Sequence, residues 1–171
     1  MTMKKGDLIP DAQFVVMEDG NPVAKTTDDL FGGQNVALFG LPGAYTPVCH
    51  KEHLPGIVQL HDVLRQNGID LIACTAVNDV FVLNRWADEL GANDKVLMLA
   101  DGNAEFAIKS GLAFDMRRYG LGVRSSRYAM LVADKKVTLL SIEGEVMEHK
   151  VSSAQHLNKQ VETYNAQNAV G

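Results

Sequence analysis

Residues 36–49 read Val-Ala-Leu-Phe-Gly-Leu-Pro-Gly-Ala-Tyr-Thr-Pro-Val-Cys, and this stretch is the most informative in the chain. Its first part, Val36–Leu41, is a short apolar run that ends at Gly and Pro, which predicts a buried strand. Thr46 is a favourable helix N-cap, and Pro47 loses nothing at the first helical position by lacking an N–H. The stretch therefore predicts a strand, a loop of small residues and a helix over Thr46–Arg65.

Cys49 is expected at the third position of that helix. Its side chain then lies in the first turn, where the positive end of the helix dipole favours a thiolate over a thiol. As the N-cap, Thr46 is expected to accept a hydrogen bond from the Cys49 N–H. Pro55 is expected to interrupt the helix and Asn67-Gly68 to close it. Most free cysteines are small core residues, but a helix start after a Gly/Pro loop favours a reactive cysteine.

Outside this stretch, the hydrophobic periodicity alternates between strands and helices. Further strands are expected at Phe14–Glu18, Pro22–Lys25, Ile69–Val77, Val96–Ala100, Tyr128–Ala133 and Val137–Ile142. Further helices are expected at Val80–Leu90, at Ala104–Ser110 and from Ala154 to Tyr164, the last after the capping-box pair Ser152 and Gln155. Both faces of the run at Ile69–Val77 are apolar, so it is expected to be a central strand. The pattern predicts an α/β fold with a mixed sheet flanked by helices.

The composition is that of an ordinary globular protein, with 46% hydrophobic and 22% charged residues. A chain of 171 residues suits a single domain over residues 1–171. The net charge of -5 and the lack of a basic stripe argue against nucleic-acid binding. The apolar stretches are too short to cross a membrane, and residues 1–6 do not begin a secretory signal. Two cysteines are too few for a disulfide scaffold, which suggests a reducing compartment, expected to be the cytoplasm.

Three segments of the chain carry a resemblance to a known family. The spacing Pro42-x-x-x-Thr46-x-x-Cys49 resembles the active-site motif of the peroxiredoxins, and residues 42–56 as a whole resemble the type II, or peroxiredoxin-five-like, branch. Residues 74–86 and 120–132 match the same branch at the expected distances. The resemblance extends from about Gly6 to Tyr164. It implies a thioredoxin-like fold and the reduction of peroxides by a cysteine thiolate.

The resemblance also assigns roles to individual residues. Cys49 matches the peroxidatic cysteine, which attacks the peroxide and becomes a sulfenic acid, and Thr46 matches the threonine that contacts the thiolate and the peroxide. Arg127 matches the arginine that reaches the pocket from a distant strand, and Pro42 matches the proline that walls it. The backbone N–H groups near Val48 and Cys49 are expected to hold the peroxide. No metal and no organic cofactor are expected, because the thiolate is itself the nucleophile.

Several other residues need to be weighed against these assignments. If the segment around Arg124 and Arg127 is one extended strand, the two side chains point to opposite faces and only Arg127 is expected in the pocket. His53 is interpreted as a hydrogen-bonding neighbour of the site and Glu52 as a residue at its edge. Cys74 is interpreted as a buried core thiol. A zinc site built from Cys49, His53 and Cys74 lacks the usual paired spacing.

The substrates implied are hydrogen peroxide and alkyl hydroperoxides. Residues 75–171 contain no cysteine, so the sulfenic acid is expected to be resolved by an external thiol, glutathione with glutaredoxin first and thioredoxin second. A homodimer is also expected. Two other functions remain open, a redox-sensing binding module or holdase on the same fold and a hydrolase that uses Cys49 and His53.

Overall fold

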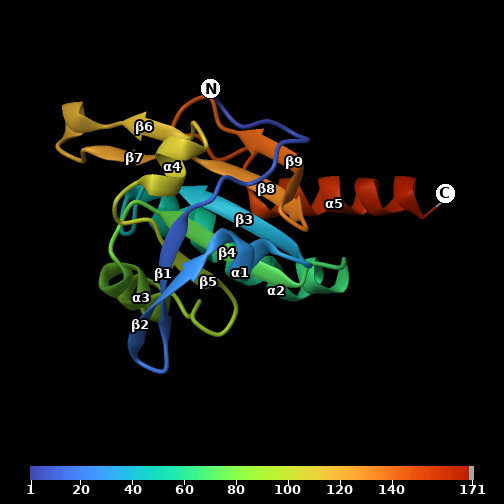
Figure 1. Cartoon of the computed structure of the whole chain (residues 1–171), viewed down its shortest axis with the longest axis horizontal. Coiled ribbons are helices and arrows are strands. Elements are labelled where there is room, and N and C mark those ends of the chain that lie inside the picture. The colour runs from blue at the N-terminus through green and yellow to red at the C-terminus, as the bar shows by residue number, and fades with distance from the viewer. Residues whose placement is uncertain (170–171) are drawn as a thin grey trace.

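A seven-stranded sheet forms the centre of the computed structural model, which describes residues 1–169 (Figure 1). Its strands are β1 Gln13–Glu18, β2 Asn21–Thr26, β3 Asn35–Leu41, β4 Leu71–Ala76, β5 Leu97–Ala100, β8 Tyr128–Ala133 and β9 Lys136–Ile142. They lie in the order β2-β1-β5-β4-β3-β8-β9. Strand β4 pairs in parallel with β3 and β5, and the other pairs are antiparallel. The prediction of a mixed sheet with a central strand near Cys74 is confirmed.

Helices cover both faces of this sheet. They are α1 Thr27–Phe31, α2 Leu54–Gln66, α3 Val80–Glu89, α4 Glu105–Lys109 and α5 Ala154–Asn168. Helices α2, α3 and α5 share a hydrophobic cluster with Phe39, whereas α1 and α4 share one with Leu38 on the opposite face. Because both faces are covered, these neighbouring residues of β3 are both fully buried. Helix α5 extends beyond the sheet in Figure 1, and among the described residues no helix is long and apolar enough to cross a membrane.

Four short elements were not predicted from the sequence. They are α1, the small sheet of β6 (Ala113–Asp115) and β7 (Val123–Ser125), and the 3-10 turn at Arg117–Tyr119. Strands of three residues are too short to show periodicity. Helix α1 did carry a sequence signal, because Thr26 and Asp29 form a capping box at its start.

The helix that carries Cys49 differs from the prediction in its first turns. It begins at Pro47 as predicted, but residues Cys49–His53 form a π-helical turn in which the N–H of Leu54 bonds to the carbonyl of Cys49. Pro55 lies in the first turn of α2 and does not interrupt the helix. In a regular α-helix the proline ring would clash with the carbonyl four residues earlier. The wider π-turn lies directly before Pro55, and it accommodates that proline within a continuous helix.

The start of the last helix also requires a correction. The N-cap of α5 is Ser153, whose hydroxyl accepts from the N–H of His156, and not Ser152 as the capping-box spacing suggested. Ser152 is fully buried, and its hydroxyl donates to the carboxylate of Glu143. Two adjacent serines are equivalent as local signals, so tertiary contacts decided which of them caps the helix.

Gly40 provides a test of the packing between β3 and β8. A Cβ at Gly40 would lie 2.0 Å from Cε1 of Tyr128, a fully buried ring on the paired strand. We expect Gly40→Ala to lower the free energy of unfolding by about 1–3 kcal/mol or more, since a packed core tolerates extra volume poorly. Urea unfolding measures the change.

Gly56→Ala is the matched control for this prediction. Gly56 lies within α2, and the nearest atom to its Cβ would be 3.8 Å away, on the side chain of Gln155. The same substitution should there stabilise the chain by roughly 0.5–1 kcal/mol through helix propensity. If both variants have the stability of the parent, the contact between Gly40 and Tyr128 is not a packing constraint.

Candidate active site

A short loop between β3 and the Cys49 helix fixes the position of Thr46. The carbonyl of Gly43 accepts both the Thr46 hydroxyl at 2.6 Å and the Thr46 N–H at 3.3 Å. The next residue, Ala44, donates its N–H to the side-chain oxygen of Asn78 at 2.9 Å. Tyr45 adopts a left-handed conformation with φ of 63°, which is uncommon for a residue other than glycine. The loop is thus held by the chain that follows the neighbouring strand β4.

The hydrogen bond of Thr46 differs from the predicted one. Its hydroxyl donates to Gly43 and does not cap the N–H of Cys49. A hydroxyl that donates one hydrogen bond keeps its lone pairs free to accept others. Thr46 can therefore accept a hydrogen bond from a peroxide without giving up its contact with the loop.

A cavity of about 270 Å³ lies beside this loop. Four of the five site residues predicted from the sequence line it, namely Pro42, Thr46, Val48 and Arg127. The fifth, Cys49, follows Val48 directly and has no exposed surface. The structure therefore brings the predicted residues together from two distant parts of the chain.

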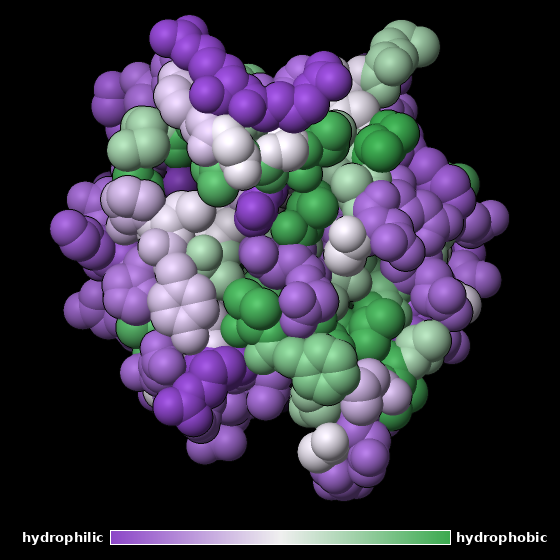
Figure 2. Space-filling model, turned by 90° about the vertical axis from the view of Figure 1, so that its left-hand side faces the viewer, coloured by the Kyte–Doolittle hydropathy of each residue, from purple (hydrophilic) through white to green (hydrophobic). Residues whose placement is uncertain are grey.

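Sequence reasoning missed the apolar residues that complete the cavity wall. They are Met116, Tyr119, Leu121, Val146 and Met147. Met116, Tyr119 and Leu121 lie in or next to the turn between β6 and β7, and Val146 and Met147 follow β9. No local signal marks these residues, since a three-residue 3-10 turn and an irregular segment show no periodicity and reach the cavity only through tertiary contacts. Figure 2 shows the corresponding end of the molecule, where apolar side chains gather within a hydrophilic surround.

Arg127 is almost completely buried, with 2% of its surface exposed. Its Nε donates to the carbonyl of Val146 at 3.0 Å, and its Nη1 donates to Nδ1 of His53 at 3.0 Å. None of the ion pairs formed within 4.0 Å among residues 1–169 involves Arg127. Its two protein partners are neutral, so the positive charge has no neighbouring carboxylate to neutralise it.

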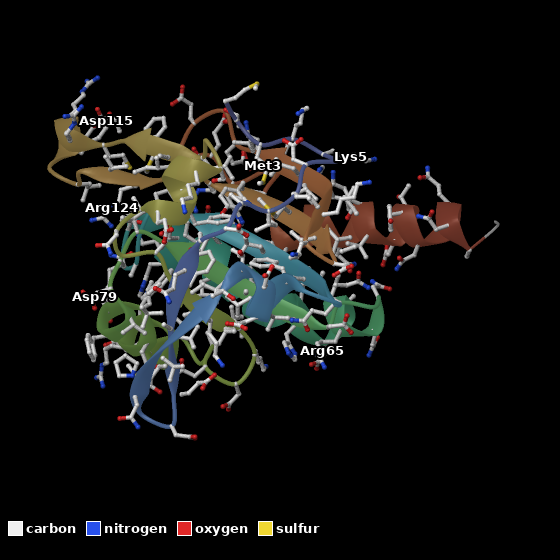
Figure 3. All side chains as sticks on the ribbon, in the orientation of Figure 1. Met3, Lys5, Arg65, Asp79, Asp115 and Arg124 are labelled. Carbon is white, nitrogen blue, oxygen red and sulfur yellow. The ribbon has the colours of Figure 1, made fainter. Side chains whose placement is uncertain are left out.

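The second arginine, Arg124, lies on a different strand from the one the sequence suggested. It belongs to β7 in the small sheet, whereas Arg127 directly precedes β8 in the main sheet. The argument from opposite faces of one strand was therefore wrong. Arg124 is labelled in Figure 3, and its Nη1 lies 2.6 Å from where a Cβ of Gly43 would be. Arg127 lines the cavity and Arg124 packs on the backbone of the loop.

His53 forms hydrogen bonds through both ring nitrogens, which confirms its interpretation as a hydrogen-bonding neighbour of the site. Because Nδ1 accepts from Arg127, Nε2 carries the proton and donates to the carbonyl of Ser152 at 2.9 Å. Burial lowers the pKa of His53 well below its ordinary value, and the charge of Arg127 lowers it further. His53 is thus held neutral with its lone pair occupied. It cannot accept the proton of Cys49, which argues against a hydrolase.

His149 was not singled out by the sequence analysis, although it contacts the same group. Its ring packs on His53 with the ring centroids 4.7 Å apart, and burial together with the charge of Arg127 lowers its pKa. Glu52 lies at the edge as expected, with its exposed carboxylate 3.8 Å from Nδ1 of His149. The Glu52 charge therefore faces His149 at the surface.

Cys74 is a buried core thiol, as predicted. It lies in β4 with no exposed surface and belongs to the same hydrophobic cluster as Cys49. Burial raises the pKa of Cys74 far above its ordinary value, and the charge of Cys49 acts in the same direction. Both cysteines are free thiols. Cys74 is therefore a poor nucleophile in the folded chain.

Comparison with known proteins identifies relatives along nearly the whole chain. The family model described as Redoxin matches residues 4–157. Peroxiredoxin-2E, a chloroplastic protein of Arabidopsis thaliana, is 44% identical over 142 residues, which cover 81% of this chain and 61% of the relative. Peroxiredoxin-2B of the same plant is 38% identical over 155 residues, which cover 90% of this chain and 95% of the relative. The chain thus spans about three fifths of the first protein and nearly all of the second.

The fold matches solved structures equally well. The crystal structure of reduced Prx3 from Vibrio vulnificus in complex with H2O2 superposes with a TM-score of 0.89 at 38% sequence identity. The match covers 94% of this chain and 99% of that one. The predicted thioredoxin-like fold, a mixed sheet flanked by helices, is confirmed.

The lowered pKa of His53 makes stability depend on pH. The unfolded chain takes up a proton near pH 6.5, before the folded chain does, so stability is complete above that pH and falls as the pH decreases toward the lower folded value. We expect a loss of up to about 1.4 kcal/mol for each pH unit in this window. In His53→Gln the free energy of unfolding should fall less steeply as the pH decreases. Urea unfolding between pH 7.5 and 5.5, roughly one unit either side of the ordinary pKa of histidine, measures this.

His156→Gln is the matched control, because His156 lies at the start of α5 and forms no hydrogen bond with Arg127. Its slope should equal that of the parent chain. An unchanged slope in His53→Gln would contradict a neutral, buried His53.

Proposed function

The chain belongs to the redoxin family and, within it, to the peroxiredoxins, and from this premise we propose that it is a thiol-dependent peroxidase. Its substrates are hydrogen peroxide and alkyl hydroperoxides. One observation carries the proposal: the buried guanidinium of Arg127 forms no ion pair with a carboxylate of residues 1–169 and lines the same cavity as Thr46, next to the helix start that bears Cys49. Such a charge stabilises an anion formed in that cavity.

The reaction follows from this arrangement. The Cys49 thiolate attacks the terminal oxygen of the peroxide, an S–O bond forms and the O–O bond breaks. Cysteine becomes a sulfenic acid, and the leaving alkoxide or hydroxide takes up a proton to give an alcohol or water. Arg127 stabilises both the thiolate and the charge that develops on the leaving oxygen. The first-turn N–H groups of Val48 and Cys49 have no acceptor within the helix and are available to the peroxide.

The shape of the cavity supports organic peroxides as substrates. Its wall is mainly apolar, and Thr46 and Arg127 are the polar side chains beside Cys49 among the lining residues. The peroxide group can then contact these two polar side chains while an alkyl chain lies against Met116 and Leu121. Removal of this apolar surface from water favours binding of the alkyl chain.

An external thiol is proposed as the reductant. The sulfenic acid condenses with glutathione to give a mixed disulfide and water, and glutaredoxin then releases the reduced Cys49; thioredoxin is the second choice. The burial and raised pKa of Cys74 support this route, because a buried neutral thiol attacks poorly. We place the chain in a reducing compartment such as the cytoplasm, where two free thiols persist.

A homodimer is proposed through the apolar end of the molecule seen in Figure 2. Tyr45 in the loop before Thr46 is exposed, and so are Tyr119 and Met147 in the cavity wall. Exposed apolar surface of this kind favours association. The alternative function, a redox-sensing binding module or holdase, requires the same Cys49 chemistry but no turnover with a reductant.

Peroxide consumption by the two cysteine variants tests the function. We expect the reduced parent chain to lose one thiol equivalent rapidly when mixed with hydrogen peroxide, Cys74→Ser to do the same, and Cys49→Ser to lose none. Intact-mass spectrometry should then show one added oxygen on Cys49. Sustained peroxide consumption with glutathione and glutaredoxin distinguishes a peroxidase from a sensor. A Cys49–Cys74 disulfide, seen as a loss of two hydrogens, would contradict the external-thiol route.

The two arginines should differ in their effect on rate. Arg127→Lys moves the charge and removes one or both hydrogen bonds of the guanidinium, so we expect peroxide reduction to slow by on the order of 10²–10³, the usual cost of losing an oriented donor. Arg124→Lys, the matched control, should slow it much less, since Arg124 packs on Gly43 outside the cavity wall. Stopped-flow loss of thiol measures both, and equal effects would remove Arg127 from its proposed role.

A further inference from the structure

We propose that Glu143 is a positioning residue for the reaction: it folds the segment from Glu143 to Ser152 so that two backbone carbonyls of the segment hold Arg127 and His53 in place. The inference rests on the proposed function, in which Arg127 stabilises the reacting charges. Glu143 is buried, with 8% of its surface exposed, and it does not line the cavity. It is thus a buried acid with no part in the proposed chemistry itself.

The carboxylate of Glu143 closes the segment on itself. Its Oε1 accepts the N–H of Lys150 at 2.6 Å, the N–H of Ser152 at 2.9 Å and the hydroxyl of Ser152 at 3.0 Å. The residues between Glu143 and Ser152 form no helix or strand, so they lack the regular backbone hydrogen bonds of such elements. The hydrogen bonds to Glu143 hold the segment in place instead. Hydrogen bonds to a charged acceptor are about twice as strong as neutral ones.

The closed segment supplies an acceptor to each of the two buried groups. The carbonyl of Val146 accepts from Nε of Arg127 at 3.0 Å, and the carbonyl of Ser152 accepts from Nε2 of His53 at 2.9 Å. The N–H of Glu143 donates to the carbonyl of Arg127 at 2.9 Å, so the start of the segment is bonded to the backbone of Arg127. His53 in turn accepts from Nη1 of Arg127. Both hydrogen bonds that the guanidinium forms within residues 1–169 therefore depend, directly or through His53, on the fold of this segment.

The ionisation of Glu143 agrees with this role. Burial acts to raise the pKa of Glu143, but the hydrogen bonds from Ser152 and Lys150 outweigh it and hold the pKa below its ordinary value. The carboxylate is therefore charged at neutral pH. It still lies more than 4.0 Å from the Arg127 nitrogens, since no ion pair joins the two side chains within residues 1–169. Glu143 thus orders the segment without neutralising the guanidinium.

If Glu143 had only a structural role, its replacement would lower the stability of the chain and leave the rate of peroxide reduction by the folded chain unchanged. Asp101 offers the matched control, because its buried carboxylate accepts the N–H groups of Phe106 at 3.1 Å and Ala107 at 2.9 Å at the start of α4 and takes no part in the hydrogen bonds of Arg127 or His53. Glu143→Leu removes the acceptor, Glu143→Gln retains one neutral acceptor oxygen, and Asp101→Asn makes the same neutralisation elsewhere.

The experiment compares these variants at a temperature at which circular dichroism shows each to be folded. Stopped-flow thiol loss with hydrogen peroxide should slow by about 10- to 100-fold in Glu143→Leu, the cost of a small misplacement of a catalytic group, and by less in Glu143→Gln. Asp101→Asn should keep the parent rate even if its melting temperature falls. In the Arg127→Lys background, Glu143→Gln should cause little further loss, because both changes act on one interaction. Parent rates in both Glu143 variants would overturn the inference, and so would a loss in the Arg127→Lys background as large as in the parent background.

A second readout does not depend on peroxidase activity. The Nε–H resonance of Arg127, identified by its loss in Arg127→Lys, should exchange slowly with solvent in the parent chain and rapidly in both Glu143 variants. Asp101→Asn should leave it protected. Continued protection in Glu143→Gln and Glu143→Leu would overturn the positioning role even if the enzyme proves to be a peroxidase. A parent chain that consumes no peroxide would instead overturn the proposed function, and the exchange rates would still decide the role of Glu143.

Discussion

The burial of the Arg127 guanidinium, which forms no ion pair within residues 1–169, is the constraint on which the rest of the site depends. Taking a cation out of water costs several kcal/mol unless its donors are satisfied. Arg127 meets this cost with two neutral acceptors, a backbone carbonyl and a neutral imidazole, and not with a carboxylate. These acceptors occupy two of the five N–H donors of the guanidinium, and the others are available to an anion. A carboxylate in the same position would stabilise the resting fold but compete with the thiolate and with the leaving oxygen for the same charge.

The π-turn in the Cys49 helix connects Cys49 with the same buried arginine. Cys49 begins this turn and His53 ends it, so a single wide turn carries both Cys49 and the acceptor of Arg127. His53 can serve only as a neutral acceptor, and burial beside a cation keeps it so. Single π-turns within α-helices occur frequently at functional sites. Here the turn joins the chemistry of Cys49 to the placement of an arginine 74 residues away from His53 in sequence.

The sheet supplies the frame for these contacts. The parallel strands β3 and β4 end at the same edge, and the segments that follow them meet there: the loop that leads to Thr46 and the side chain of Asn78 that holds it. Sites at the carboxyl ends of parallel strands are a general property of α/β sheets. The antiparallel strand β8, which pairs with β3, brings Arg127 to the same edge. The cavity thus forms where a helix start, a loop and an antiparallel strand meet.

The sequence alone predicted the main strands and helices, and it pointed to Cys49 as the candidate reactive residue. Apolar runs, the Pro-Gly loop and the order Thr46, Pro47 and Cys49 are local signals, and local signals suffice to predict strand, loop and helix and to place a cysteine in a first turn. Cys74 could be recognised as buried because its strand is apolar on both faces. The resemblance of residues 42–56 to peroxiredoxins indicated the family before any contact was known.

Only the tertiary structure decided how these parts meet. Arg124 and Arg127 are three residues apart and look equivalent in sequence, but the chain leaves the small sheet between them and enters the main one. Likewise Ser152 and Ser153 are equivalent as caps until Glu143 binds one of them. Met116 and Met147 carry no local signal and line the cavity because two irregular segments fold over it. The physical reason is the same in each case: caps and periodicity act over a few neighbouring residues, whereas a buried charge selects its partners by distance in space.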